Sequence, residues 1–356
     1  MKIARIATTP VMAPLRRPVR TASGTIDRFP LVLIDVVADD GAEGRAYAQV
    51  YQPELLPALD RTVAGLAAMI AGLPLVPREL HAFLLRRCRL LGVKNLTGMA
   101  LGALDMALWD AWSRARGEPL VRALGVEPRA HKAYNSVGLY DAREVTAIAR
   151  ETRAAGYAGL KIKAGFPTLA EDVAAVRAAR DALGDGIALM VDYNQSLDPD
   201  EALTRCTALD GEGLEWIEEP VLADDFAACA RIAAAVATPI QIGENFNGPA
   251  EMRAALATRC MDRVMPDAQY IHGVTGWLEA AALAQAAGVP MSTHTFVEAS
   301  VHLLCATPTA DWLEVLDAAG GVRRSTLSLR DGRIAPSAAP GLDIDWNDDA
   351  VARHRA

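Results

Sequence analysis

From residue 129 onward, short apolar segments alternate with longer stretches of helical periodicity, and this alternation restricts the fold more than any other feature of the sequence. The apolar segments are rich in Val, Ile and Leu and have no hairpin turns between them. Their ranges are 133–137, 160–163, 188–193, 214–218, 240–244, 263–266, 290–293 and 312–315. Repeated strand–helix units without hairpins imply parallel strands with right-handed crossovers. Eight such strands are the number that closes a barrel.

An open, doubly wound sheet is the alternative for such a pattern. That fold usually carries a G-x-G-x-x-G turn after its first strand, and the nearest match, at residues 184–186, lacks the third glycine. The barrel is therefore favoured.

The residues on either side of the barrel predict a second domain. Residues 2–8, 31–38 and 43–49 have the composition of strands, whereas residues 57–73, 76–91 and 97–116 have helical spacing. No helix is expected after the last barrel strand, and residues 324–346 are expected to run extended, back to the first block. The predicted domains are a 1–128 α+β capping domain, a 129–320 barrel and a 321–356 segment that completes the cap. The fold class is α/β.

Composition and charge exclude several classes of protein. With 51% hydrophobic and 22% charged residues, the chain is too apolar to be disordered. A net charge of −8 and scattered arginines argue against nucleic acid as a partner. No apolar run is long enough for a membrane span, and residues 1–20 lack a secretory signal, so a soluble, cytoplasmic protein is expected. Five scattered cysteines indicate neither a disulfide framework nor a thiolate zinc site.

Polar residues stand where almost every predicted barrel strand ends, and in a barrel these ends converge on the face that carries active sites. Asp192, Glu218 and Glu244 follow three consecutive strands. Three oxygen ligands without Cys or His favour Mg²⁺ over zinc. The alternative is a set of exposed acids that cap the strands. Glu219 is expected to point to the opposite side, toward the helices.

Two lysines and a histidine on the same face are candidate proton-transfer groups. Only five of the 36 basic residues are lysines, and Lys161 and Lys163 share one face of a strand. Two adjacent ammonium groups should depress each other's pKa, so that one serves as a base. His294 lies opposite, and Asp267, one strand away, could orient its ring. Glu314, if protonated, could donate a hydrogen bond to an oxyanion. A solvated lysine pair and a structural histidine are the alternatives.

Together these groups suit abstraction of the weakly acidic proton α to a carboxylate, because a divalent metal can neutralise the enolate as it forms. They do not suit nucleophilic hydrolysis, since the sequence has no G-x-S-x-G motif and no cysteine at a strand end.

Over nearly its whole length, the chain resembles the enolase superfamily, mandelate racemase subgroup. The resemblance rests on L-K-I-K at residues 160–163, V-D-Y-N-Q at 191–195, W-I-E-E-P at 216–220, I-G-E-N at 242–245, P-D-A at 266–268, S-T-H at 292–294 and W-L-E at 312–314. It implies a modified (β/α)7β TIM barrel with an α+β N-terminal capping domain. R-T-A-S-G-T at residues 20–25 resembles the mobile capping loop of that family.

The resemblance also implies residue roles. Asp192, Glu218 and Glu244 would bind one Mg²⁺ per subunit, Lys163 and His294 would be opposed bases, and Asp267 would partner His294. Lys161 and Glu314 would contact the substrate carboxylate, with Asn194 and Ser136 as neighbours. The specificity pocket would comprise Tyr51, Gln49, Val137, Ser23 and Ile26. The family is commonly octameric, so a homo-octamer or other homo-oligomer is expected.

The pattern departs from mandelate racemase in the pocket, where Gln49 replaces a phenylalanine and Val137 a histidine. We therefore expect a racemase of a 2-hydroxycarboxylate for which mandelate is a poor substrate and a smaller or more polar acid a better one. An outward-facing Gln49 that leaves the pocket apolar is the alternative. The alternative function is an acid-sugar dehydratase that uses the same site, and a non-catalytic scaffold is the third possibility.

Overall fold

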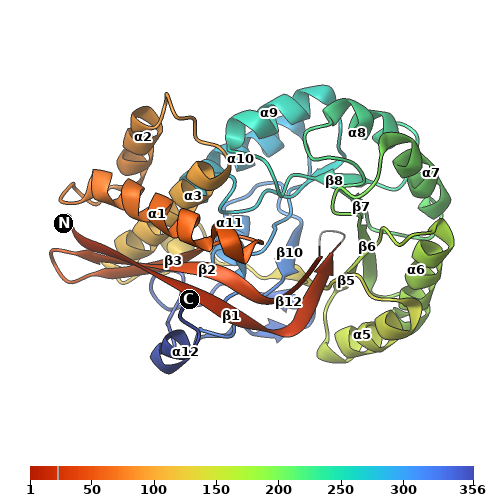
Figure 1. Cartoon of the computed structure of the whole chain (residues 1–356), viewed down its shortest axis with the longest axis horizontal. Helices are drawn as coiled ribbons and strands as arrows, with labels where there is room; N and C mark the ends of the chain where they lie inside the picture. Colours follow the sequence, from red (N-terminus) through yellow and green to blue (C-terminus); the bar gives the residue numbers. More distant parts are fainter. Residues whose placement is uncertain (22–23) are drawn as a thin grey trace.

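The capping domain and the barrel lie side by side in the structure, a computed structural model that describes residues 1–21 and 24–356 (Figure 1). The interpretation of Ser23 as a pocket residue therefore falls outside the described residues. The (β/α)7β barrel with an α+β cap, predicted from the sequence, is confirmed.

The cap consists of an antiparallel sheet covered by helices. The sheet has the order β1 (Ile3–Thr21), β2 (Gly24–Ala38) and β3 (Glu43–Gln49), and the helices are α1 (Leu56–Ile70), α2 (Pro77–Arg87) and α3 (Asn95–Arg114), with a 3₁₀ turn at Pro53–Leu55. Helix α3 is buried along most of its length because it packs on β3 on one side and on the barrel on the other.

The prediction that the first strand spans residues 2–8 was wrong, because β1 continues to Thr21. The prolines and arginines beyond residue 9 interrupt the apolar alternation, yet β1 stays paired with β2 across an irregularity between Pro14 and Val19. Proline is tolerated at such an edge position. The long β1–β2 hairpin reaches from the cap sheet toward the barrel (Figure 1).

The barrel repeats a strand–helix unit around a ring. A short helix, α4 (Leu120–Ala123), precedes it. The ring then runs β4 (His131–Ser136), α5 (Ala142–Ala155), β5 (Gly159–Lys163), α6 (Leu169–Leu183), β6 (Ala188–Asp192), α7 (Pro199–Leu209), β7 (Ile217–Glu218), α8 (Phe226–Ala233), β8 (Ile240–Ile242), α9 (Pro249–Thr258), β9 (Arg263–Val264), α10 (Gly273–Ala287), α11 (Val297–Cys305) and β10 (Trp312–Val315). Neighbouring strands from β4 to β9 pair in parallel, and β10 pairs with β4.

The seventh barrel strand, expected at residues 290–293, is not a regular strand. Met291 forms isolated parallel bridges to Val264 and Ala310, and His294 bridges to Asp267. Pro290 cannot donate to a ladder, which limits pairing at the start of this segment. The barrel still closes, and the bridge at His294 lies on the face where the functional side chains gather. Strands β7, β8 and β9 are also shorter than predicted.

The C-terminal segment connects the two domains. The hairpin β11 (Leu329–Arg330) and β12 (Arg333–Ile334) pairs with β4, whereas Trp346 donates a hydrogen bond to Asp35 of the cap. The expectation that no helix follows the last barrel strand was wrong. Helix α12 (Asp348–Arg353) follows this segment, and the Asn347 side chain caps its N-terminus by accepting a hydrogen bond from the backbone N–H of Ala350.

Below the functional face, a buried cluster of Tyr134, Met190, Trp216 and Trp312 fills the barrel interior. The barrel interior is therefore packed with side chains, and a site is expected at the carboxyl ends of the strands. Among the helices in the described residues, none is long and apolar enough to cross a bilayer.

Candidate active site

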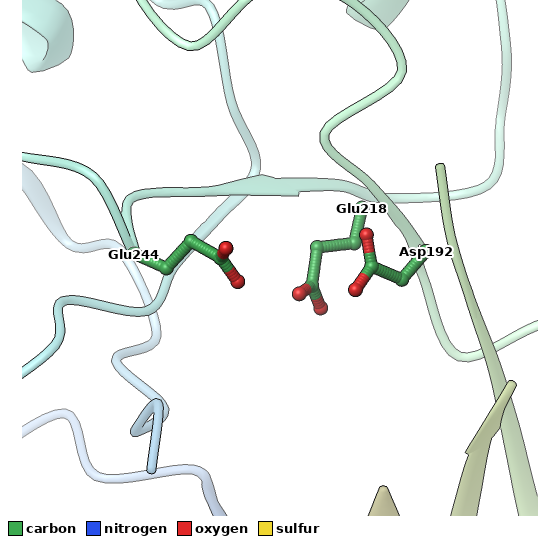
Figure 2. A group of neighbouring side chains, drawn as sticks. All are labelled: Asp192, Glu218 and Glu244. Carbon is green, nitrogen blue, oxygen red and sulfur yellow. The ribbon is translucent and has the colours of Figure 1, made fainter. Parts of the chain in front are cut away.

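Three carboxylates converge at the ends of consecutive barrel strands. Asp192 ends β6, Glu218 ends β7, and Glu244 follows β8. Each offers an oxygen, and these three oxygens lie within 4.8 Å of one another. Figure 2 shows Glu244 on one side of Glu218 and Asp192 on the other, with the carboxylates directed toward a common space. All three residues are buried, so the alternative of exposed strand-capping acids was wrong.

The raised pKa of one of these three carboxylates agrees with a site that requires additional positive charge. Burial raises the pKa of Glu218 to about 8, and although Lys161 opposes the shift, the charge of Asp192 adds to it. Clustered buried carboxylates are stable as anions only when positive charge lies between them. An all-oxygen donor set of this size suits a hard divalent cation such as Mg²⁺.

Hydrogen bonds from neighbouring residues fix the direction of these carboxylates. The indole N–H of Trp216, the residue before β7, donates to Glu218 over 2.9 Å. The backbone N–H and side-chain amide of Asn194 donate to the two oxygens of Asp192 over 2.7 and 3.2 Å. Asn194 therefore positions a candidate ligand, and its own amide oxygen is buried without a hydrogen-bond partner among the described residues. The role of Trp216 was missed from the sequence, although its i, i+2 spacing from Glu218 places both on one face.

Glu219, expected to point toward the helices, is almost fully buried and has a positive φ of 40°. It accepts hydrogen bonds from the side-chain amides of Gln195 and Asn245, at 3.1 and 3.0 Å. It therefore lies in a polar layer behind the three carboxylates.

The two lysines occupy different positions relative to the carboxylates. Lys161 is fully buried, with its Nζ 2.6 Å from Glu218 and 2.9 Å from Glu314. Lys163 donates to Asp192 over 2.8 Å. The predicted repulsion between the two ammonium groups is present, but the expected net lowering of the Lys163 pKa was wrong for this arrangement. Burial and Lys161 do lower the pKa of Lys163, but Asp192 outweighs them and the pKa is raised. A divalent cation between the carboxylates would act in the opposite direction.

The loop that follows Lys163 is held by a buried ion pair. One oxygen of Asp172 accepts hydrogen bonds from the backbone N–H groups of Gly165 and Phe166, over 2.9 and 3.0 Å. The other oxygen lies 2.7 Å from Arg205, which also donates to the Phe166 carbonyl. Asp172 of α6 and Arg205 of α7 thus hold the loop at the end of β5 in place.

His294 forms the other side of the site. Its Nδ1 lies 2.8 Å from Asp267, and its Nε2 lies 3.3 Å from Glu244. Burial opposes a charged ring, but Glu244 and Glu314 outweigh burial and raise the pKa of His294 to about 10. The second oxygen of Asp267 accepts from the backbone N–H groups of Gln269 and Tyr270. Asp267 and His294, assigned to neighbouring strands from the sequence, are therefore in direct contact.

Glu314 differs from its expected state. Burial favours the neutral acid, but Lys161 and then His294 outweigh burial and lower the pKa of Glu314 to about 2. The backbone N–H of Thr295 also donates to it over 2.8 Å. Glu314 therefore accepts hydrogen bonds and pairs with Lys161 as a carboxylate. The expectation that it is protonated and donates to an oxyanion was wrong.

The end of β3 brings the cap into the site. Gln49 is 2% exposed, and its side-chain amide donates to the Thr295 hydroxyl over 3.3 Å, whereas its amide oxygen is buried without a hydrogen-bond partner among the described residues. The alternative of an outward-facing Gln49 was therefore wrong. Gln49 and Gln269 also exchange two hydrogen bonds. Gly102 permits this contact, because a Cβ there would lie 2.0 Å from the Gln269 carbonyl oxygen.

The other pocket residues lie near the barrel rim. Burial, followed by the charge of Glu244, raises the pKa of the Tyr51 hydroxyl, which places Tyr51 in the electrostatic environment of the carboxylates. Ser136 pairs with Lys161 across β4 and β5, and Val137 follows it. Ile26 lies in β2, opposite Val19 near the tip of the hairpin.

The hairpin itself is fastened to the loop after β4. The Leu139 N–H donates to the Arg20 carbonyl over 2.8 Å, and Arg20 forms an ion pair with Glu144 over 3.0 Å. A Cβ at Gly138 would lie 2.4 Å from the Arg20 backbone nitrogen, so this close approach requires glycine. The hairpin thus contacts the barrel next to Ser136 and Val137.

Comparisons with known proteins agree with this architecture. Residues 3–125 match the model of the mandelate racemase/muconate lactonizing enzyme N-terminal domain, and residues 144–350 match the enolase C-terminal domain-like model. An enolase from Bradyrhizobium, solved in complex with magnesium and mandelic acid, is 41% identical with a TM-score of 0.96. That alignment covers 100% of this chain and 98% of the other.

Curated relatives perform different reactions. The L-talarate/galactarate dehydratase of Salmonella typhimurium is 34% identical over 265 residues, which cover 73% of this chain and 66% of the relative. The L-Ala-D/L-Glu epimerase of Bacillus subtilis is 28% identical over 317 residues, which cover 86% of this chain and 84% of the relative. Because both domain models match in chain order and together account for most of the sequence, the chain belongs to the mandelate racemase/muconate lactonizing enzyme subgroup of the enolase superfamily.

Proposed function

We propose that this protein is a Mg²⁺-dependent racemase that removes the α-proton of a 2-hydroxycarboxylate and returns a proton to either face. One observation supports this function more than any other. Lys163 contacts Asp192 and His294 contacts Glu244, the two outer members of the carboxylate group in Figure 2. Two proton-transfer groups on opposite sides of one site are what a racemase requires.

Asp192, Glu218 and Glu244 would hold one Mg²⁺ per subunit, which supplies positive charge where the substrate's carboxylate gains electron density. Lys161 adds a fixed positive charge between Glu218 and Glu314. Its contact with a substrate carboxylate would bind the acid and orient its α-carbon. Glu314, ionised, would hold this ammonium in place.

In one direction Lys163 accepts the α-proton and His294 protonates the opposite face of the planar enolate, and in the other direction the roles are exchanged. Because Nδ1 of His294 faces Asp267, Nε2 is the nitrogen available to the substrate. Each base must be neutral to accept a proton. A divalent cation beside Asp192 and Glu244 would lower the pKa of both bases toward that state.

The pocket favours a polar substrate. Gln49 presents a buried amide oxygen that has no hydrogen-bond partner within residues 1–21 and 24–356, and a substrate hydroxyl could donate to it. Leaving such an acceptor unsatisfied against an aryl ring costs roughly 1–3 kcal/mol, or about tenfold to a hundredfold in turnover. Tyr51, Ser136, Val137, Ile26 and Ser23 would form the remaining contacts. We therefore expect a small or polyhydroxylated acid to be preferred over mandelate.

The polar pocket also supports a second candidate, an acid-sugar dehydratase. In that reaction the same enolate expels a β-hydroxyl group as water, with protonated His294 as the acid. The 34% identity to a L-talarate/galactarate dehydratase agrees with this candidate. Only a substrate with a β-leaving group permits elimination, so substrate chemistry separates the two.

A library of hydroxy acids and acid sugars should be screened by polarimetry for racemisation and by keto-acid detection for dehydration. Loss of optical rotation without keto acid supports the racemase, and keto-acid formation supports the dehydratase. Absence of both reactions, with metal bound, would favour the scaffold. We also propose a homo-octamer or other homo-oligomer, and light scattering would measure its mass.

A further inference from the structure

We infer that Thr295 is a positioning residue that couples the capping domain to the His294 side of the site. This inference rests on the proposed function, because it assigns Thr295 a role in proton transfer by His294. Thr295 directly follows His294 and is fully buried, with contacts to the cap, to Asp267 and to Glu314.

The backbone at Thr295 adopts a conformation that its side chain disfavours. Thr295 and Phe296 have φ values of 44° and 43°, in the left-handed region, immediately before α11 begins at Val297. A β-branched residue in this region is uncommon and strained. Such strain persists only where surrounding contacts hold it, and it concentrates at functional sites.

Those contacts come from α11 and from the cap. The Ser300 hydroxyl donates to the Thr295 carbonyl over 2.7 Å. The Phe296 ring stacks on Tyr47 of β3 with centroids 4.8 Å apart, and Tyr47 also donates to Glu298, which pairs with Arg323. The strained turn is therefore fixed by residues from the cap, α11 and the C-terminal segment.

The turn directs two donors of Thr295 at two residues of the site. Its hydroxyl donates to Asp267 Oδ2 over 2.8 Å, the same oxygen that faces His294 Nδ1. Its backbone N–H donates to Glu314 Oε2 over 2.8 Å. Thr295 thus fixes the carboxylate that orients the His294 ring and the carboxylate that holds Lys161.

The Thr295 hydroxyl also accepts the amide N–H of Gln49. A continuous series of hydrogen bonds therefore runs from β3 of the cap through Thr295 to Asp267 and His294. When the cap engages a substrate through Gln49, this series transmits the position of the amide to the histidine ring. A second route leads from the backbone N–H of Thr295 through the ion pairs of Glu314 and Lys161 to Asp192, which Lys163 contacts. That route does not use the Thr295 hydroxyl.

The decisive test replaces the hydroxyl and keeps the shape. Thr295→Val retains the β-branch and its backbone preference, whereas Thr295→Ser retains the hydroxyl. Each change is placed in two backgrounds, Lys163→Ala, in which His294 alone exchanges the α-proton with D₂O, and His294→Asn, in which Lys163 alone does so. Thr307→Val is the matched control, because Thr307 is also buried and its hydroxyl also both donates and accepts.

We expect Thr295→Val to slow exchange in the Lys163→Ala background by about tenfold to a hundredfold, the typical cost of a misplaced catalytic group. Exchange in the His294→Asn background should change by less than about threefold, and Thr295→Ser should restore most of the loss. Equal loss in both backgrounds, equal loss in Thr307→Val, or no loss would overturn the inference.

A double-mutant cycle tests the link to the cap. Gln49→Leu and Thr295→Val should be clearly non-additive in kcat/KM, because each removes one end of the same hydrogen bond. Additive effects would show that the cap does not act through Thr295.

Crystal structures of Thr295→Val and Thr295→Ser test the position of the His294 ring independently of any activity. The contact of 2.8 Å between His294 Nδ1 and Asp267 should lengthen in the valine variant and persist in the serine variant. If neither background exchanges any α-proton, the two-base function fails, and these structures still decide whether Thr295 positions the ring. An unchanged ring in Thr295→Val would overturn the inference by itself.

Discussion

The two sides of the site are supported in different ways. Lys163 is followed by a loop that Asp172 and Arg205 fix, and both of these residues belong to barrel helices. On the other side, the Asp267–His294 pair is linked through Thr295 to Gln49 of the cap. The Lys163 side is therefore held mainly by the Asp172–Arg205 pair of the barrel helices, whereas the Thr295 hydroxyl joins the His294 side directly to the cap.

Under the proposed function, this difference would let the substrate preference of the protein change while its proton-transfer chemistry stays the same. If Lys163 is the base that we propose, its support from the barrel helices would keep it in position whatever the cap binds. The proposed base His294 would instead be adjusted through Gln49, the residue that we propose to contact the substrate. Changes in the barrel helices should therefore affect the Lys163 side, and changes at the interface of cap and barrel should affect the His294 side.

Metal removal should have the largest effect, because it acts on both sides at once. EDTA should abolish α-proton exchange from both enantiomers, and Mg²⁺ should restore it. Glu218→Gln should weaken Mg²⁺ binding in calorimetry, since it removes one anionic ligand. Full activity in EDTA, with an empty site by metal analysis, would contradict the role of the carboxylates. The two sides of the site would then share no metal.

Breaking the ion pair behind Lys163 should be the next largest effect. Arg205→Met leaves the buried Asp172 carboxylate unpaired and should lower the free energy of unfolding by about 3–5 kcal/mol. Where the variant folds, exchange by Lys163 should fall more than exchange by His294. Denaturant unfolding and face-specific exchange measure the two effects.

Arg177→Met is the control for this change, because Arg177 forms a more exposed ion pair with Glu212. Exposed pairs contribute about 0–1 kcal/mol. Equal loss of stability in the two variants, or a larger loss at His294 than at Lys163 in Arg205→Met, would contradict a barrel-held lysine.

The free energy of unfolding should fall as the pH rises and Asp105, at the interface of cap and barrel, loses its proton. Burial raises the pKa of Asp105 from its usual 3.8 to about 7, although Thr275 of α10 donates to it through its backbone N–H and its hydroxyl. The unfolded chain loses this proton near pH 4 and the folded chain only near pH 7. This contribution to stability is therefore complete below pH 4 and is lost as pH rises toward 7, by about 1.4 kcal/mol per pH unit.

Asp105→Asn should flatten that slope. The measurement is the free energy of unfolding at several pH values between 4 and 7 in the wild type and the variant. Parallel curves would show that Asp105 is ionised throughout and that this part of the interface is indifferent to pH.

Substitution of Gln49 should have the smallest effect, confined to substrate preference. Gln49→Phe removes the buried amide oxygen and should shift kcat/KM toward aryl acids by about tenfold to a hundredfold. The values for mandelate and for polar hydroxy acids test this. Efficient turnover of mandelate by the wild type, unchanged in the variant, would contradict a polar pocket.

Much of the site could be predicted from the sequence, because parallel barrel strands place their ends side by side in chain order. Asp192, Glu218 and Glu244 needed only this rule to be grouped, and so did Asp267 and His294. Their ionisation states could not be predicted in the same way. The low pKa of Glu314 depends on a lysine nitrogen 2.9 Å away, which no pattern of residues specifies.

The supporting residues were harder to predict. The contacts of Thr295 depend on its left-handed backbone conformation, and those of Gln269 depend on the packing of α3 against the barrel. Neither feature follows from the periodicity of the sequence. The full length of β1 was missed because its prolines resemble a loop, although pairing with β2 holds it in a strand. Contacts between domains, which depend on tertiary packing, are the common cause of these omissions.

The two opposed bases are the central claim, and exchange of the α-proton with D₂O in single variants tests it most directly. For a substrate found by the screen, each enantiomer is incubated separately with Lys163→Ala and with His294→Asn, and deuterium incorporation is followed by NMR. We predict that each variant exchanges only one enantiomer, that the two variants exchange opposite enantiomers, and that racemisation is lost in both. Retained racemisation in either variant, or loss of exchange at both faces from a single substitution, would contradict this account.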